Sequence, residues 1–108
     1  MSHPNEIPEI DPHEARRRIE AGALHVDVRE RDEHTRVRIA GGVLLPLSEF
    51  MERFEGELPK EQEIVVSCRS GARSGRATAL LREHGYDAVN LGGGILAWEE
   101  EGLPVERG

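Results

Sequence analysis

Cysteine is almost absent from this 108-residue sequence, in which Cys68 is the single thiol. One cysteine excludes an internal disulfide. The five histidines show no His-x-x-x-His spacing and have no cysteine pair to complete a site, so the sequence argues against structural zinc. We therefore expect no metal, and the role of Cys68 has to be inferred from its surroundings.

Long apolar runs and an excess of positive charge are also missing. The apolar stretches span only a few residues, such as 64–66, whereas a membrane-spanning helix needs about twenty. Residues 1–6 have neither the basic nor the apolar segment of a secretory signal, so we expect a cytoplasmic protein without a membrane partner. The 14 Lys and Arg against 21 Asp and Glu give a net charge of −7, which argues against a nucleic-acid partner. Any anion-binding site must therefore depend on positive groups clustered at one place in the fold.

The remaining pattern alternates strands with helices. Helices are predicted at 12–21, 48–54 and 76–84, with Asp11 and Ser48 as N-caps, and a short last helix follows the glycine run 92–94. Strands are predicted at 23–28, 43–47, 63–67 and 88–91, and the charged segment 30–38 is compatible with a short helix or a loop. This order predicts an α/β fold, with a central, mainly parallel sheet of about five strands and helices on both faces.

The chain length fits one domain over residues 1–108, with 1–6 and 106–108 expected to be loose. The glycine run 92–94 lacks the Gly-x-Gly-x-x-Gly spacing of a dinucleotide-binding turn. We therefore expect no nucleotide or other cofactor, and we expect that run and Trp98 to serve in turn formation and packing.

Cys68 stands at the C-terminal end of the most apolar predicted strand. Ligands of open α/β sheets bind beyond the carboxyl ends of strands, and a loop entering a helix offers amide N–H groups and a dipole that favour negative charge. Arg69 and Arg73 add positive charge, and such surroundings lower thiol pKa values. Most free cysteines are small buried apolar residues, but this loop favours a reactive thiolate beside an anion site.

Four motifs extend over nearly the whole chain. They are Val26-Asp27-Val28-Arg29-Glu30, Cys68-Arg69-Ser70-Gly71-Ala72-Arg73-Ser74, Gly85-Tyr86 and Leu91-Gly92-Gly93-Gly94-Ile95-Leu96-Ala97-Trp98. In this order they resemble the motifs of single-domain rhodaneses, which are thiosulfate sulfurtransferases and their relatives. The segment Arg38-Ile39-Ala40-Gly41-Gly42 departs from the His-Ile-Pro-Gly-Ala that is common in the family.

The resemblance implies a small rhodanese-like domain and a two-step reaction. Cys68 would attack the outer sulfur of a small anionic donor such as thiosulfate, release sulfite and hold a persulfide. A small thiol, a protein thiol or cyanide would then receive the terminal sulfur of this persulfide. The main-chain amides of residues Arg69, Ser70, Gly71, Ala72, Arg73 and Ser74 would cradle the negative charge. The side chains of Arg69 and Arg73 would bind the anionic substrate.

Asp27 and Arg29 are expected to support the neighbouring strand end through an ion pair or main-chain hydrogen bonds. Two other functions stay open. Phosphatases and arsenate reductases share this architecture but have Cys-x-x-x-x-x-Arg spacing, whereas Arg73 stands one residue earlier and position 74 is serine. The second alternative is a sulfur carrier or interaction module that accepts sulfur on Cys68 from a partner and does not turn over.

Overall fold

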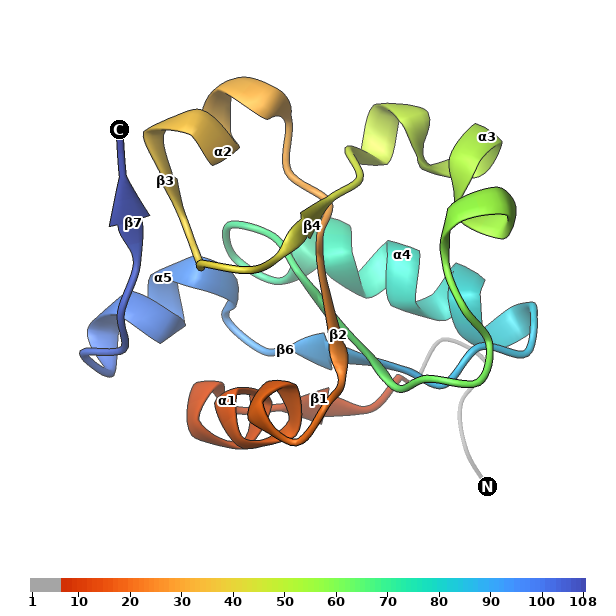
Figure 1. Cartoon of the computed structure of the whole chain (residues 1–108), viewed down its shortest axis with the longest axis horizontal. Helices are drawn as coiled ribbons and strands as arrows, with labels where there is room; N and C mark the ends of the chain where they lie inside the picture. Colours follow the sequence, from red (N-terminus) through yellow and green to blue (C-terminus); the bar gives the residue numbers. More distant parts are fainter. Residues whose placement is uncertain (1–6) are drawn as a thin grey trace.

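A computed structural model describes residues 7–108 of the chain (Figure 1). Within that range the helices are α1 (Pro12–Glu20), α2 (Arg31–Arg36), α3 (Leu47–Glu57), α4 (Ala72–Glu83) and α5 (Gly94–Glu100). The strands are β1 (Glu9–Ile10), β2 (Leu24–Asp27), β3 (Val37–Arg38), β4 (Val43–Leu44), β5 (Ile64–Ser67), β6 (Ala88–Leu91) and β7 (Glu106–Arg107).

Five strands form one parallel sheet in the order β1-β6-β5-β2-β4. All four residues of the central strand β5 are buried, as expected for a parallel strand that is covered on both faces. In the register, Val26 of β2 and Asn90 of β6 flank Val66 of β5. The predicted α/β fold with a parallel sheet of about five strands is confirmed.

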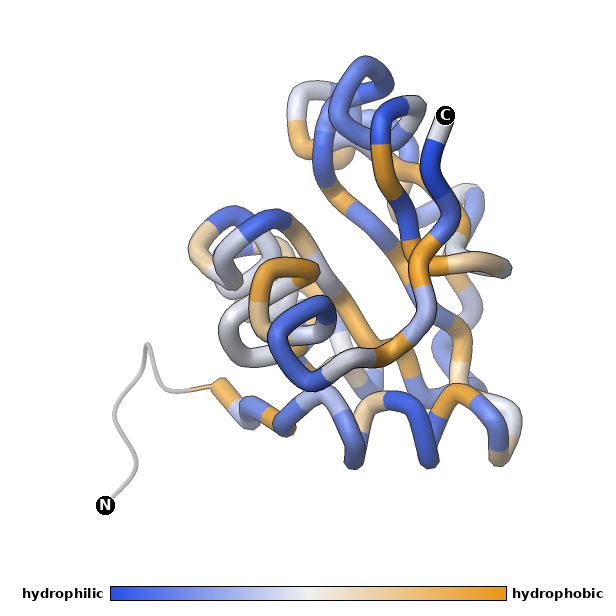
Figure 2. The backbone as a smooth tube through the Cα atoms, turned by 90° about the vertical axis from the view of Figure 1, so that its left-hand side faces the viewer, coloured by the Kyte–Doolittle hydropathy of each residue, from blue (hydrophilic) through white to orange (hydrophobic). Residues whose placement is uncertain are grey.

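Helices cover both faces of this sheet because side chains of alternating strand residues point to opposite sides. Val66 packs with Phe50 and Phe54 of α3 and with Leu81 of α4, whereas Val65 belongs to the core beneath α1 and α5. Figure 2 shows the tube alternating between apolar and polar stretches along the helices, as amphipathic helices require. The sheet therefore separates two apolar cores.

Several boundaries differ from the sequence prediction. The segment 30–38 forms α2 and β3, and Ser48 is not an N-cap, because α3 begins at Leu47 after Pro46 and the Ser48 hydroxyl binds Glu30. Helix α4 starts at Ala72, four residues before the predicted start at Arg76. The loop between β5 and α4 is correspondingly short.

The expectation of a loose end at 106–108 is wrong for Glu106 and Arg107, which form β7. This strand pairs antiparallel with β3, beside it in Figure 1 and away from α3 and α4. The predicted loose segment 1–6 lies outside the described residues. Among residues 7–108, no helix is both long and apolar enough to cross a bilayer.

Candidate active site

Cys68 follows β5 directly, and the loop that it begins is clamped by α5. The amide of Ile95 donates to the Cys68 carbonyl at 2.9 Å, and the amide of Leu96 donates to the Arg69 carbonyl at 3.2 Å. These bonds use the otherwise unpaired N–H groups at the start of α5. The first two residues of the loop are thus fixed to a helix that lies far away in the sequence.

The loop turns at Gly71, whose φ of +102° is the left-handed conformation that favours glycine. This turn points the Gly71 amide at the Cys68 sulfur, with an N–Sγ distance of 3.0 Å. Gly71 is also the N-cap of α4, so the sulfur lies at the start of a twelve-residue helix, where the helix dipole favours negative charge. Gly75 lies inside the helix.

Ser74, in the first turn of α4, brings a hydroxyl to the same sulfur, with an Oγ–Sγ distance of 3.3 Å. Burial raises the pKa of the Cys68 thiol, but hydrogen bonds from the Ser74 hydroxyl and from the amides of Ser74, Gly71 and Ser70 outweigh it and lower the pKa below its ordinary value. The side chain is nearly inaccessible and contacts the apolar core, yet its sulfur meets polar donors. The Gly71 amide and the start of α4 therefore favour negative charge on the sulfur, and Ser74 is a donor that Cys68 shares with Asn90.

Arg73 does not extend freely over the loop. Its guanidinium makes two hydrogen bonds to the Glu33 carboxylate of α2, at 2.7 and 2.8 Å. These bonds lower the pKa of Glu33 to about 2, so the carboxylate stays charged at neutral pH. Arg73 was expected to bind substrate, and in the structure its planar donor group is already matched by a carboxylate.

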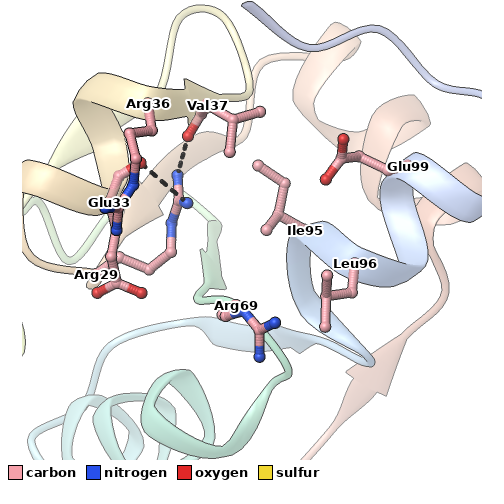
Figure 3. A pocket seen from close by; sticks show the side chains of 8 residues that line it. All are labelled: Arg29, Glu33, Arg36, Val37, Arg69, Ile95, Leu96 and Glu99. Atoms are coloured by element: carbon pink, nitrogen blue, oxygen red, sulfur yellow. Dashed lines mark hydrogen bonds between the residues drawn. The ribbon is translucent and has the colours of Figure 1, made fainter. Parts of the chain in front are cut away.

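Arg69 is exposed and, within residues 7–108, its side chain makes no hydrogen bond or ion pair. It borders an opening of about 130 Å³ between α2 and α5. Figure 3 shows Arg29, Glu33 and Arg36 on one side of this opening and Ile95, Leu96 and Glu99 on the other, with Arg69 between them. Cys68 does not line the opening. Arg69, which follows Cys68 and has no ion-pair partner among residues 7–108, is the cation beside the loop that can bind an anion.

Asp27 and Arg29 form a buried ion pair at the end of β2. Arg29 Nη2 donates to Asp27 Oδ2 at 2.8 Å and to the Val37 carbonyl at 2.7 Å, and both side chains are less than a twentieth exposed. The amide of Val28 donates to the Ser67 carbonyl at 2.9 Å, which ties this strand end to the residue before Cys68. The pair connects β2 with β3 next to the cysteine loop.

Three residues of this region were not identified from the sequence. Asn90 of β6 binds the Ser74 hydroxyl and the Gly71 carbonyl, Glu9 binds Asn90, and Glu33 binds Arg73. One signal was available for Glu33: Glu30 and Glu33 form a capping box at the start of α2, a three-residue spacing that is visible in the sequence. The partners of Asn90 arise from strand pairing and have no local signal.

The sequence is similar to those of known proteins. The family pattern described as the rhodanese-like domain matches residues 11–101. A sulfurtransferase of Allochromatium vinosum is 43% identical over 76% of this chain and 77% of its own length. Thiosulfate sulfurtransferase 18 of Arabidopsis thaliana is 32% identical over 93% of this chain and 84% of its own.

The fold is similar to solved structures as well. The crystal structure of a rhodanese-related protein from Thermoplasma volcanium superimposes with a TM-score of 0.86 at 33% identity, over 92% of this chain and 97% of that one. A match across residues 11–101 includes β2, the loop that begins at Cys68, and α5. The chain belongs to the rhodanese-like domain family.

Proposed function

We propose that the protein is a sulfurtransferase that carries sulfur on Cys68 and takes it from thiosulfate or a related anionic donor. The thiolate attacks the outer sulfur of the donor, a new S–S bond forms, and the bond to the sulfonate sulfur breaks with its electron pair leaving on sulfite. A small thiol, a protein thiol or cyanide then attacks the terminal sulfur and releases the Cys68 thiolate.

The observation that carries this proposal is the polar cradle around a buried sulfur. The Gly71 amide and the Ser74 hydroxyl both lie within hydrogen-bond reach of Cys68 Sγ at the start of α4. Donors fixed before the reaction stabilise developing negative charge without rearranging. The lowered pKa of Cys68 increases the fraction of the nucleophilic thiolate at a given pH.

The same cradle supports sulfur transfer over phosphoryl transfer. A phosphate-binding loop needs a free guanidinium facing the oxyanion, whereas Nη1 and Nη2 of Arg73 both donate to the Glu33 carboxylate. The next residue is Ser74, which contacts the sulfur. Arg69, which is exposed beside the loop, is therefore our candidate for binding the anionic donor. The similarity to a protein named thiosulfate sulfurtransferase supports the choice of thiosulfate.

The direct test is incubation with thiosulfate followed by intact-protein mass spectrometry and measurement of sulfite. We expect the mass to rise by one sulfur atom in the wild type and to stay unchanged in Cys68→Ser, because only the thiolate can form the persulfide. An unchanged wild-type mass, with the Cys68 thiol free at the start, contradicts the proposal. With a small thiol present, a sulfurtransferase releases sulfite continuously, whereas a sulfur carrier loads once and stops.

The role of Arg69 has a charge-matched control. Arg76, on the exposed side of α4, makes no ion pair within the described residues. Arg69→Gln and Arg76→Gln change the net charge equally, so only a local contact separates them. We expect a several-fold higher KM for thiosulfate in Arg69→Gln alone. Equal KM values in the two variants contradict donor binding by Arg69.

A further inference from the structure

Asn90 is fully buried in β6, and its hydrogen bonds fix which way its amide points. The amide nitrogen Nδ2 lies 3.0 Å from Glu9 Oε2 and 3.1 Å from the Gly71 carbonyl, and both of these atoms are acceptors. Rotating the amide by half a turn would place Oδ1 against those two acceptors. Asn90 Oδ1 therefore faces Ser74, where the Oγ–Oδ1 distance is 2.6 Å.

The Ser74 hydroxyl has one proton and two neighbours that need it. Asn90 Oδ1 only accepts hydrogen bonds, so at 2.6 Å the proton must lie between Ser74 Oγ and Oδ1. The Cys68 sulfur, 3.3 Å away on the other side, then meets a lone pair of Oγ. A neutral S–H group fits this arrangement, because it donates to Oγ while Oγ donates to Asn90.

A thiolate fits it less well. To donate to a charged Sγ, the Ser74 hydroxyl must leave Asn90 Oδ1 buried and without a donor, which is unfavourable. We propose that Asn90 is a positioning residue that competes with Cys68 for the Ser74 proton and so shifts the balance toward the states in which Sγ carries no charge. These states are the thiol and, if the proposed function holds, the persulfide, whose charge lies on the terminal sulfur. Relative to the thiolate, Asn90 thus favours the thiol and the sulfur-loaded form alike.

Charged groups lie on several of the elements that surround the cysteine loop. Glu9 of β1 binds Asn90, Asp27 at the end of β2 pairs with Arg29, Glu33 of α2 binds Arg73 of α4, and Arg69 follows Cys68 in the loop. Helix α5 contributes the amide of Ile95 at the Cys68 carbonyl. All of these groups remain in every variant. Asn90→Leu also removes the hydrogen bond to Glu9, but it does so with and without the Ser74 hydroxyl, so this effect cancels in a double-mutant cycle.

The test is a double-mutant cycle of wild type, Asn90→Leu, Ser74→Ala and the double variant, with the Cys68 pKa taken from the pH dependence of alkylation by iodoacetamide. We expect Asn90→Leu to lower the pKa by about one unit, a tenfold larger ionised fraction at low pH, because the hydroxyl is free to donate to the sulfur. In the Ser74→Ala background the same substitution should shift the pKa by less than about 0.3 units.

Asn90 also holds the Gly71 carbonyl, so a purely structural role has to be separated. Displacement of Gly71 would change the pKa equally with and without the Ser74 hydroxyl. Equal shifts in the two backgrounds, or no fall in Asn90→Leu, therefore overturn the proposal. Asn90→Ala repeats the measurement if the leucine variant unfolds in a thermal melt. Alkylation requires no sulfur donor, so a failure of the proposed function appears separately, as missing sulfur uptake.

Discussion

At the scale of single residues, His25 is a buried titratable group that the proposed reaction does not use. Its ring lies in β2 and is almost fully inaccessible, with Nε2 2.7 Å from the Ser67 hydroxyl. Among residues 7–108, Nδ1 has no hydrogen-bond partner, and Gly42 packs so closely that a Cβ there would lie 2.7 Å from Nδ1. A protonated ring would place a second buried N–H against this surface without an acceptor.

Burial lowers the pKa of His25 to about 4 from an ordinary value of 6.5. The unfolded chain therefore binds a proton near pH 6.5, whereas the folded chain does so only near pH 4. Stability from this group is complete above pH 6.5 and is lost as the pH falls toward 4. We expect the free energy of unfolding, measured in urea, to fall by about 2 kcal/mol between pH 7.5 and pH 5.

The control for this loss is a pair of glutamine variants. His25→Gln keeps a nitrogen near Ser67 but does not titrate, so most of the decrease between pH 7.5 and pH 5 should disappear. His84→Gln changes an exposed histidine and should retain it. Carboxylates such as Glu33, with a pKa of about 2, lose their contribution at lower pH and leave this window undisturbed. If the free energy of unfolding of His25→Gln falls by as much as that of the wild type, the loss does not come from His25.

The site was predictable at the residue scale where its chemistry is local in sequence. Cys68 and Gly71 stand within one loop, so residue types and spacing indicate a sulfur at the end of a strand, facing amides. The engagement of Arg73 by Glu33 was not predictable, because the two residues stand forty positions apart. Nor was the contact between Ser74 and Asn90, which depends on the pairing of β5 with β6.

At the scale of secondary structure, the start of α5 is built against the cysteine loop. Gly94 is buried with a φ of +61°, and a Cβ at this position would overlap the carbonyl groups of Cys68 and Arg69. These are main-chain atoms and cannot swing aside as a flexible side chain can. The glycine run was correctly predicted to form a turn, but the surface that it approaches could not be inferred from local sequence.

We therefore expect Gly94→Ala to destabilise the fold by about 3 kcal/mol, from left-handed strain and overlap together. The same substitution should move the loop and slow sulfur loading from thiosulfate. Gly102→Ala is the matched control, because its φ is +74° and a Cβ would meet nothing within 4 Å. Left-handed strain alone predicts that Gly102→Ala lowers the free energy of unfolding by about 1 kcal/mol and leaves sulfur loading from thiosulfate unchanged. Urea unfolding and mass spectrometry measure both effects, and equal losses would contradict a specific overlap.

At this scale, long helices and strands were predicted more accurately than short ones. Helix α1 begins at Pro12 with Asp11 as its N-cap, as the sequence indicates, since proline and a capping carboxylate act locally. The pairs β1 with β6 and β3 with β7 involve two-residue strands. Strands this short carry no hydrophobic alternation, so their existence depends on partners that lie far away in the sequence.

At the scale of the whole molecule, one sheet serves two cores. Strand β5 contributes Val66 to the core with Phe54 and Val65 to the core with Trp98, and it is hydrogen-bonded to β2 and β6. Alternation along a strand predicts that two faces exist. The strand order, which decides which helices cover each face, needs the long-range pairings that the structure supplies.

Because the strands are shared, weakening one core should lower the stability of both. Trp98, the only tryptophan, reports on its own core through fluorescence, while far-UV circular dichroism reports on all helices. Phe54→Leu removes the stacking of Phe54 on Phe50 and should cost about 1 to 2 kcal/mol. We expect both urea transitions to shift together, as in a two-state unfolding.

The control is Met51→Ala, on the exposed side of α3, which should change the free energy of unfolding by less than about 0.5 kcal/mol. A fluorescence midpoint that stays at its wild-type value while the circular dichroism midpoint falls would show that the two cores unfold separately.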